Sequence, residues 1–95
     1  MNEKTTYQQK LQAQLDQWDA QIDVLKAKAE KADADMKLQI DKQLAEFKTQ
    51  RNAAAQKMAE LKDAGDDAWE DLKDGVENAW RSLGKAVETA TSRFR

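Results

Sequence analysis

The sequence predicts an all-α protein built as a long-helix antiparallel hairpin, a coiled coil whose turn lies near Gly65. Three observations lead to this prediction. The 95 residues include no proline and only three glycines, the two residue types that most often end a helix. Larger apolar residues recur at steps of three and four, which places them on one helix face. Charged residues make up 36% of the chain, as expected for the outer faces of long helices.

The first helix is predicted over about residues 5–63, because an apolar stripe runs through this range without a break. From Leu15 to Met36 the steps alternate strictly between three and four, as in the heptads of a coiled coil. At Met36 two steps of four follow one another, which locally relaxes a left-handed supercoil. The stripe comprises Leu11, Leu15, Trp18, Ile22, Leu25, Ala29, Ala32, Met36, Ile40, Leu44, Phe47, Met58 and Leu61.

The turn is predicted at residues 64–66 and a second helix at about 67–93. Gly65 can adopt the left-handed conformation that ends many helices. Asp67 is placed to cap the next helix, with Glu70 three residues later as in a capping box. Acidic residues crowd the start of this helix and basic residues its end, which suits the helix dipole.

The second helix carries an eleven-residue repeat, DAWEDLKDGVE followed by NAWRSLGKAVE. Eleven residues in three turns keep the apolar stripe on one face with little supercoil. The three tryptophans of the chain all lie on the apolar spacing, so we assign them to helix packing; Trp69 and Trp80 would be the first to touch a lipid surface if the hairpin opened. The stripe here comprises Trp69, Leu72, Val76, Trp80, Leu83, Val87 and Phe94.

The hairpin leaves residues 7–32 without a partner inside the chain. A second copy would then cover them, in an antiparallel dimer or a higher homo-oligomer. The alternative is a three-helix bundle with an extra turn near Asp33–Asp35. Because residues 31–35 contain no glycine or proline, we favour the uninterrupted helix. The bundle would pair Leu25 with Leu44, Ile22 with Phe47, and Leu15 with Ala54. Either arrangement makes residues 1–95 a single domain.

Composition argues against several classes of function. With no histidine and no cysteine, the commonest catalytic base and the best nucleophile are absent, so we expect no enzyme activity and no cofactor. The acidic residues between 63 and 74 lack the spacing of a calcium loop, so we expect no metal site. A net charge of −2 argues against nucleic acid binding. No apolar run is long enough to cross a membrane, and we expect a cytoplasmic protein.

The last third of the chain resembles the ending of a group of small bacterial coiled-coil proteins described as stress-response or apolipoprotein-like. The resemblance lies in a Gly-Asp turn and a tandem A-W-x-x-L-x-x-x-V-E unit. It implies a soluble bacterial helical protein without catalytic residues, and a connection to stress response. The unit occupies Ala68, Trp69, Leu72, Val76 and Glu77, and again Ala79, Trp80, Leu83, Val87 and Glu88.

We therefore expect a non-enzymatic structural or interaction protein that self-associates through its apolar stripe. The alternative is a surface-active protein, phasin-like or apolipoprotein-like, whose repeats lie flat on a lipid or granule surface. A third reading is docking of a helical protein partner against the N-terminal half. Residues 59–78 carry a net charge of −6 and residues 79–95 a net charge of +3. Since surface-binding helices usually carry basic polar faces, this pattern favours self-association over peripheral lipid contact.

Overall fold

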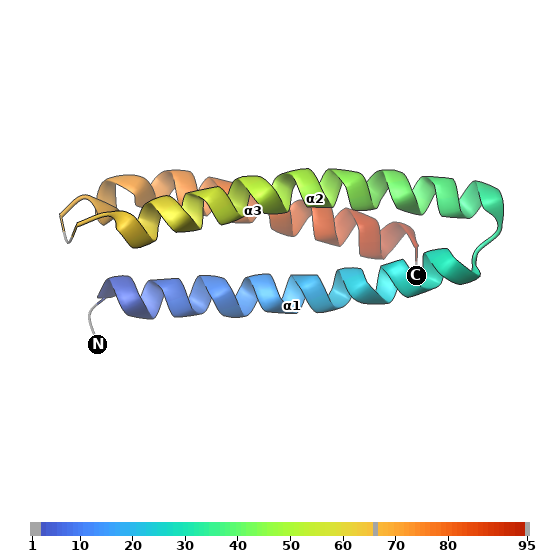
Figure 1. The fold of residues 1–95 in the computed structure, drawn as a ribbon, viewed down its shortest axis with the longest axis horizontal. Coiled ribbons are helices and arrows are strands. Elements are labelled where there is room, and N and C mark those ends of the chain that lie inside the picture. Colours follow the sequence, from blue (N-terminus) through green and yellow to red (C-terminus); the bar gives the residue numbers. More distant parts are fainter. Residues whose placement is uncertain (1–2, 66, 95) are drawn as a thin grey trace.

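The part of the chain that the structure describes is all-helical, as predicted, and contains three helices: α1 (Glu3–Lys31), α2 (Ala34–Asp63) and α3 (Trp69–Arg93). The computed structural model describes residues 3–65 and 67–94. The helices run up, down and up beside one another in a rod with extents of 51 × 20 × 18 Å (Figure 1). α3 ends before it reaches the turn between α1 and α2 (Figure 1).

The prediction of an uninterrupted helix over about residues 5–63 is wrong in this structure, because the chain turns at Ala32 and Asp33. At this turn Asp33 caps α2 with an extended backbone (φ −67°, ψ 171°). Its carboxylate Oδ1 accepts a hydrogen bond from the backbone N–H of Met36 at 2.8 Å. An aspartate cap therefore begins α2 at a position where neither glycine nor proline is present. The division falls beside the extra turn that the alternative arrangement required.

The second turn also differs in its chemistry from the prediction. α2 ends at Asp63, and its cap Ala64 is extended (φ −71°, ψ 141°). Gly65 is not left-handed, since no described residue has a positive φ. α3 begins at Trp69, and its cap Ala68 makes no side-chain hydrogen bond, so the predicted capping box at Asp67 is absent. Instead the N–H groups of Ala68 and Trp69 donate to the carbonyl of Gly65 at 3.1 and 3.2 Å. Residue 66 of the predicted turn lies outside the described residues.

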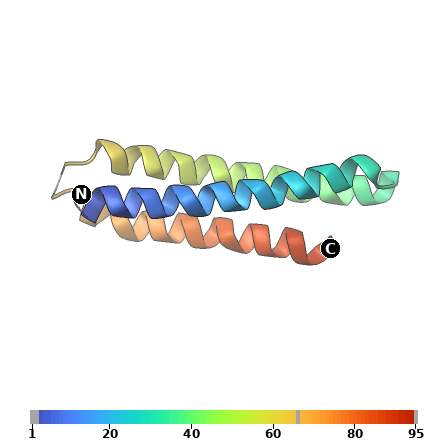
Figure 2. The ribbon, with the colours of Figure 1, turned by 90° about the horizontal axis from the view of Figure 1, so that it is seen from below.

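One apolar core runs along the rod and receives side chains from all three helices. No polar or charged side chain among the described residues is buried. α2 and α3 lie next to each other, and α1 runs along one side of this pair (Figures 1 and 2). The least exposed large side chains are Ile22 of α1, Ile40 and Leu61 of α2, and Val76, Leu83 and Val87 of α3.

The rod shape leaves this core thin. The chain exposes 6452 Å², whereas a compact protein of this mass exposes about 5500 Å². Its radius of gyration is 15.4 Å, against about 12.4 Å for a compact chain of this length. Each helix therefore buries one stripe and keeps most of its circumference in solvent.

Candidate interaction surface

The predicted apolar stripe is the candidate interaction surface, and most of it faces inward. Tyr7, Trp18, Leu44 and Leu72 are partly buried against the core. Met36 departs from the prediction: it is 42% exposed at the end of the rod where α1 turns into α2. Residues predicted for the stripe that are buried are Leu11, Leu15, Ile22, Leu25, Ala29, Ile40, Phe47, Met58, Leu61, Trp69, Val76, Trp80, Leu83, Val87 and Phe94.

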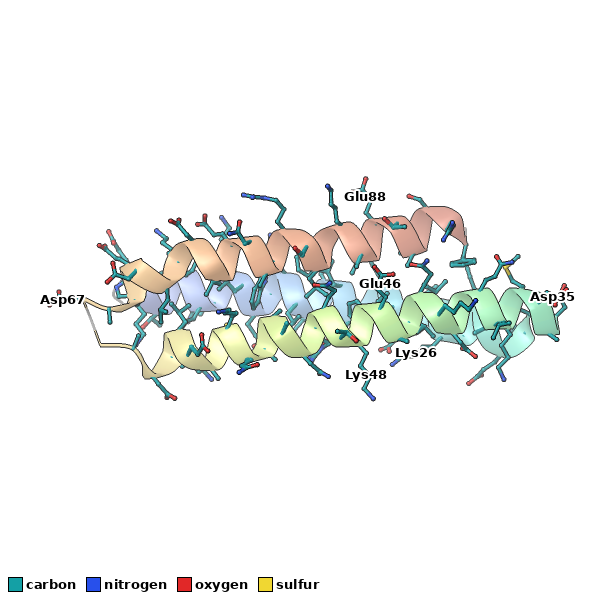
Figure 3. All side chains as sticks on the ribbon, turned by 90° about the horizontal axis from the view of Figure 1, so that it is seen from above. Lys26, Asp35, Glu46, Lys48, Asp67 and Glu88 are labelled. Atoms are coloured by element: carbon teal, nitrogen blue, oxygen red, sulfur yellow. The ribbon has the colours of Figure 1, made fainter. Side chains whose placement is uncertain are left out.

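The charged side chains lie on the opposite faces of the helices. Lys26 of α1, Lys48 of α2 and Glu88 of α3 all project away from the core (Figure 3). Because the two kinds of side chain are separated on the described helices, the stripe that would contact an apolar partner is the same stripe that packs the three helices together. Two further apolar side chains lie outside it: Val24 and Leu38 are each 59% exposed.

The indole of Trp18 in α1 packs against the backbone of α3 at Gly84. A Cβ atom built on Gly84 would lie 3.0 Å from Cζ2 and 3.5 Å from Cη2 of the Trp18 ring. The absence of a side chain at Gly84 therefore gives the indole its place against α3. Sequence reasoning placed Trp18 on the stripe but gave no role to Gly84, because the glycine lies inside a helix and has no turn to make.

A buried hydrogen bond also joins α3 to α1. The indole N–H of Trp80 donates to the backbone carbonyl of Leu11 at 3.2 Å. Trp80 is 4% exposed, so its only polar atom would be costly to leave without an acceptor. The bond satisfies the indole without placing a polar side chain in the core.

At one end of the rod, an aromatic cluster links the start of α1 to the start of α3. The rings of Tyr7 and Trp69 lie 5.9 Å apart, and the Lys73 ammonium lies 5.2 and 5.1 Å from their centroids. The Tyr7 hydroxyl donates to Glu77 Oε1 at 3.4 Å. Partial burial, followed by the charge of Glu77, raises the pKa of Tyr7 to about 12. The cluster thus favours a neutral phenol between a cation and a carboxylate.

An ion pair ties the middle of α1 to α2. Arg51 donates from Nε and Nη2 to the two carboxylate oxygens of Asp19, each at 2.8 Å. The hydrogen bond to Asp19 is the main cause that raises the pKa of the Arg51 guanidinium. Both side chains are about one third exposed (36% and 33%), so the pair fixes register more than it adds stability.

Lysines fasten the two ends of α1. Lys4 Nζ donates to the carbonyl oxygens of Lys62, at 3.0 Å, and of Ala64, at 2.5 Å. Lys28 Nζ donates to the carbonyl of Phe94 at 3.0 Å. Both lysines therefore meet the C-terminal carbonyls of a neighbouring helix, which have no partner within that helix and carry partial negative charge.

Three negative findings bear on the remaining sequence expectations. No described helix is long and apolar enough to cross a membrane. Within residues 3–65 and 67–94, no group of three or more carboxylates is arranged to hold a metal ion. Comparisons with protein-family models, with curated proteins and with solved structures find no match for this chain.

Proposed function

We propose that this chain is a non-enzymatic, surface-active helical protein, closed as a three-helix bundle in water and opened at an apolar surface. The observation that carries this proposal is the composition of the core. The described helices share one apolar core that contains no buried polar or charged side chain. Transfer of this stripe from the core to a lipid or storage-granule surface therefore requires no charged side chain to be desolvated.

In the proposed opening, α1 separates from the α2–α3 pair about the turn at Ala32 and Asp33. α1 is the helix that lies apart in Figure 1. Its ion pair and lysine contacts to the other two helices lie at the rod surface, and the hydrogen bond from the Trp80 indole to the Leu11 carbonyl is the buried contact that opening has to break. Lys4, Asp19 and Lys28 make polar contacts that water can replace. The thin core lowers the apolar area that separation exposes, and an apolar surface then covers the same area.

The charges favour a surface without net charge. α1 contains five acidic and five basic residues, α2 five and six, and α3 five and four. None of the described helices therefore carries the strong net positive charge that anionic membranes select. We expect binding to zwitterionic phospholipid vesicles or oil emulsions, with weak dependence on salt. The sequence favoured self-association over this function, but the closed chain already covers the predicted stripe except at Met36, so burial of the rest needs no second copy.

The test is flotation with phosphatidylcholine-coated oil droplets, using chains locked by a short bifunctional maleimide. The chain has no native cysteine, so two introduced thiols react alone. The Asp19→Cys/Arg51→Cys variant fastens α1 to α2 across the ion pair. The Gln50→Cys/Ser82→Cys variant fastens α2 to α3, since both residues line one groove between these helices. Each variant before cross-linking serves as its own control.

We expect the α1–α2 lock to abolish flotation and the α2–α3 lock to preserve it. Equal flotation of both locked proteins would contradict opening at α1, and absence of flotation for the unmodified chain would refute the surface function. Tryptophan emission is a poor readout here, because Trp69 and Trp80 are already 6% and 4% exposed in the closed chain.

A further inference from the structure

We propose that two copies of this chain form a dimer by exchanging α1, so that each α1 packs on the α2–α3 pair of the other copy. In this dimer the turn at Ala32 and Asp33 straightens, and α1 and α2 join into one continuous helix. The partner is a second copy of the same chain. Dimer formation of this kind requires no apolar surface and is measured in water alone.

The geometry of the turn favours such an exchange. At Asp33 the φ of −67° is already helical, and its ψ of 171° departs from the helical value of about −42°. No described residue needs a left-handed conformation, so no glycine fixes the turn. The side-chain cap from Asp33 to the Met36 N–H is the one interaction there that a continuous helix loses, since its backbone groups regain helical partners. Short hinge turns of this kind promote exchange between protomers.

The apolar stripe keeps the phase of a continuous helix through the turn. Ala29, Ala32, Met36 and Ile40 follow one another at steps of three, four and four. A sequence that only needed a turn at this point would have no reason to maintain that spacing. In the closed chain Met36 lies at the end of the rod and is 42% exposed. In the exchanged dimer it lies at the centre, where the two continuous helices cross and each can cover the stripe of the other.

The contacts of the closed chain have the register that a two-fold dimer requires. Asp19 and Arg51 each lie sixteen residues from Asp35, one before it and one after it. Asp35 stands at the turn end of the rod in Figure 3. A two-fold axis beside Asp35 therefore brings Asp19 of one copy to Arg51 of the other. Because α3 stays packed on its own α2, Trp18 of the first copy also meets Gly84 of the second. The exchange preserves every contact that α1 makes and adds those at the crossing.

Two substitutions at adjacent positions separate the closed chain from the exchanged dimer. Asp33→Ala removes the cap and introduces the best helix former, so it should favour the continuous helix about tenfold in each chain. The association constant then rises about a hundredfold, because both turns of the dimer change. Ala34→Pro acts in the opposite direction. Proline is tolerated at the first position of α2, and Asp33 already has the extended backbone that precedes proline. Within a continuous helix the same proline removes a backbone hydrogen bond and clashes with the preceding turn.

The experiment measures mass by light scattering over a concentration series for the unmodified chain and both variants. The exchanged geometry is then tested by mixing two single-cysteine proteins, Asp19→Cys and Arg51→Cys, each in the Asp33→Ala background. A short bifunctional maleimide should join the two different proteins, since their thiols approach only between copies. Circular dichroism verifies that each variant keeps its helical content.

The expected result is a dimer for Asp33→Ala at concentrations where Ala34→Pro is a monomer, with cross-linking between the mixed proteins. Three outcomes would overturn the proposal: a helical Asp33→Ala variant that stays monomeric at the highest concentration, a dimer that gives no cross-link between residues 19 and 51, or equal dimerisation of Ala34→Pro. The flotation result does not alter any of these outcomes.

Discussion

Replacing Gly84 with alanine tests whether α1 is seated on α3 as described. An added Cβ atom would lie 3.0 Å from Cζ2 of Trp18, closer than ordinary van der Waals contact. Overpacking of this kind costs about 1–3 kcal/mol. The same substitution also exchanges glycine for the best helix former inside α3, which stabilises the helix by about 1 kcal/mol. We therefore expect Gly84→Ala to change the free energy of unfolding by between about 0 and −2 kcal/mol.

Gly75 provides the matched control. It also lies inside α3, and nothing is found within 4 Å of a Cβ atom built on it. Gly75→Ala should therefore keep the whole helix-propensity gain of about 1 kcal/mol. In a domain of this size that gain raises the melting temperature by about 4–8 °C. The two glycine variants should thus differ in stability by about 1–3 kcal/mol although their sequence change is identical.

The assay is urea unfolding followed by far-ultraviolet circular dichroism, with thermal melts as a second measurement. A third variant isolates the contact: in a Trp18→Leu background, Gly84→Ala should recover the stabilisation seen for Gly75→Ala, because the clashing ring atoms are absent. The reasoning is refuted if Gly84→Ala and Gly75→Ala stabilise the unmodified chain equally. That result would mean that Trp18 does not occupy the surface of α3 in solution, as in the long-helix hairpin.

Two further predictions concern the first turns of α1. Tyr7, the single tyrosine, should ionise with a pKa of about 12. Because the pKa is raised in the folded chain, the neutral phenol contributes fully to the free energy of unfolding below the ordinary pKa near 10. This contribution is lost as the pH rises toward 12. Tyrosinate absorbance measures this, Glu77→Gln should lower the pKa, and a midpoint near 10 would contradict the partial burial of the phenol. Gln8 has an enclosed side-chain nitrogen without a partner among the described residues. Gln8→Leu should therefore stabilise the chain by about 1 kcal/mol in urea unfolding. The exposed Gln14→Leu should have little effect, and an equal gain there would point to general hydrophobicity instead.

The helical content and most of the core were predictable from the sequence because both follow from one period. Steps of three and four identified Ile22, Leu61 and Leu83 as inward-facing, and each is almost completely buried. The eleven-residue repeat likewise located α3 to within two residues at its start. These features depend on the spacing of apolar residues along each helix, and this spacing can be measured from the sequence alone.

The path of the chain was less predictable, because it depends on small energies. An aspartate cap is worth about 1 kcal/mol, so Asp33 alone does not decide between a turn and a continuous helix. The remaining free energy that favours the turn comes from packing of α1 on the other helices. This packing energy cannot be estimated from the sequence unless the register of the helices is known. The same limit applies to Trp18 with Gly84 and to Asp19 with Arg51, whose members come from different helices. At Asp67 the sequence predicted an interaction that the structure lacks. The capping motif is present in the sequence, but α3 has no side-chain cap hydrogen bond.

The lysine ties of α1 have a consequence for tolerance to substitution. Lys4 and Lys28 donate to main-chain carbonyls, at residues 62, 64 and 94, rather than to side chains. Every amino acid supplies a carbonyl, so the receiving positions can vary in identity while the fastening persists. The donors have no such freedom, since only a long cationic side chain spans the gap between helices. In related chains, residue identity should therefore vary widely at the acceptor positions and little at Lys4 and Lys28.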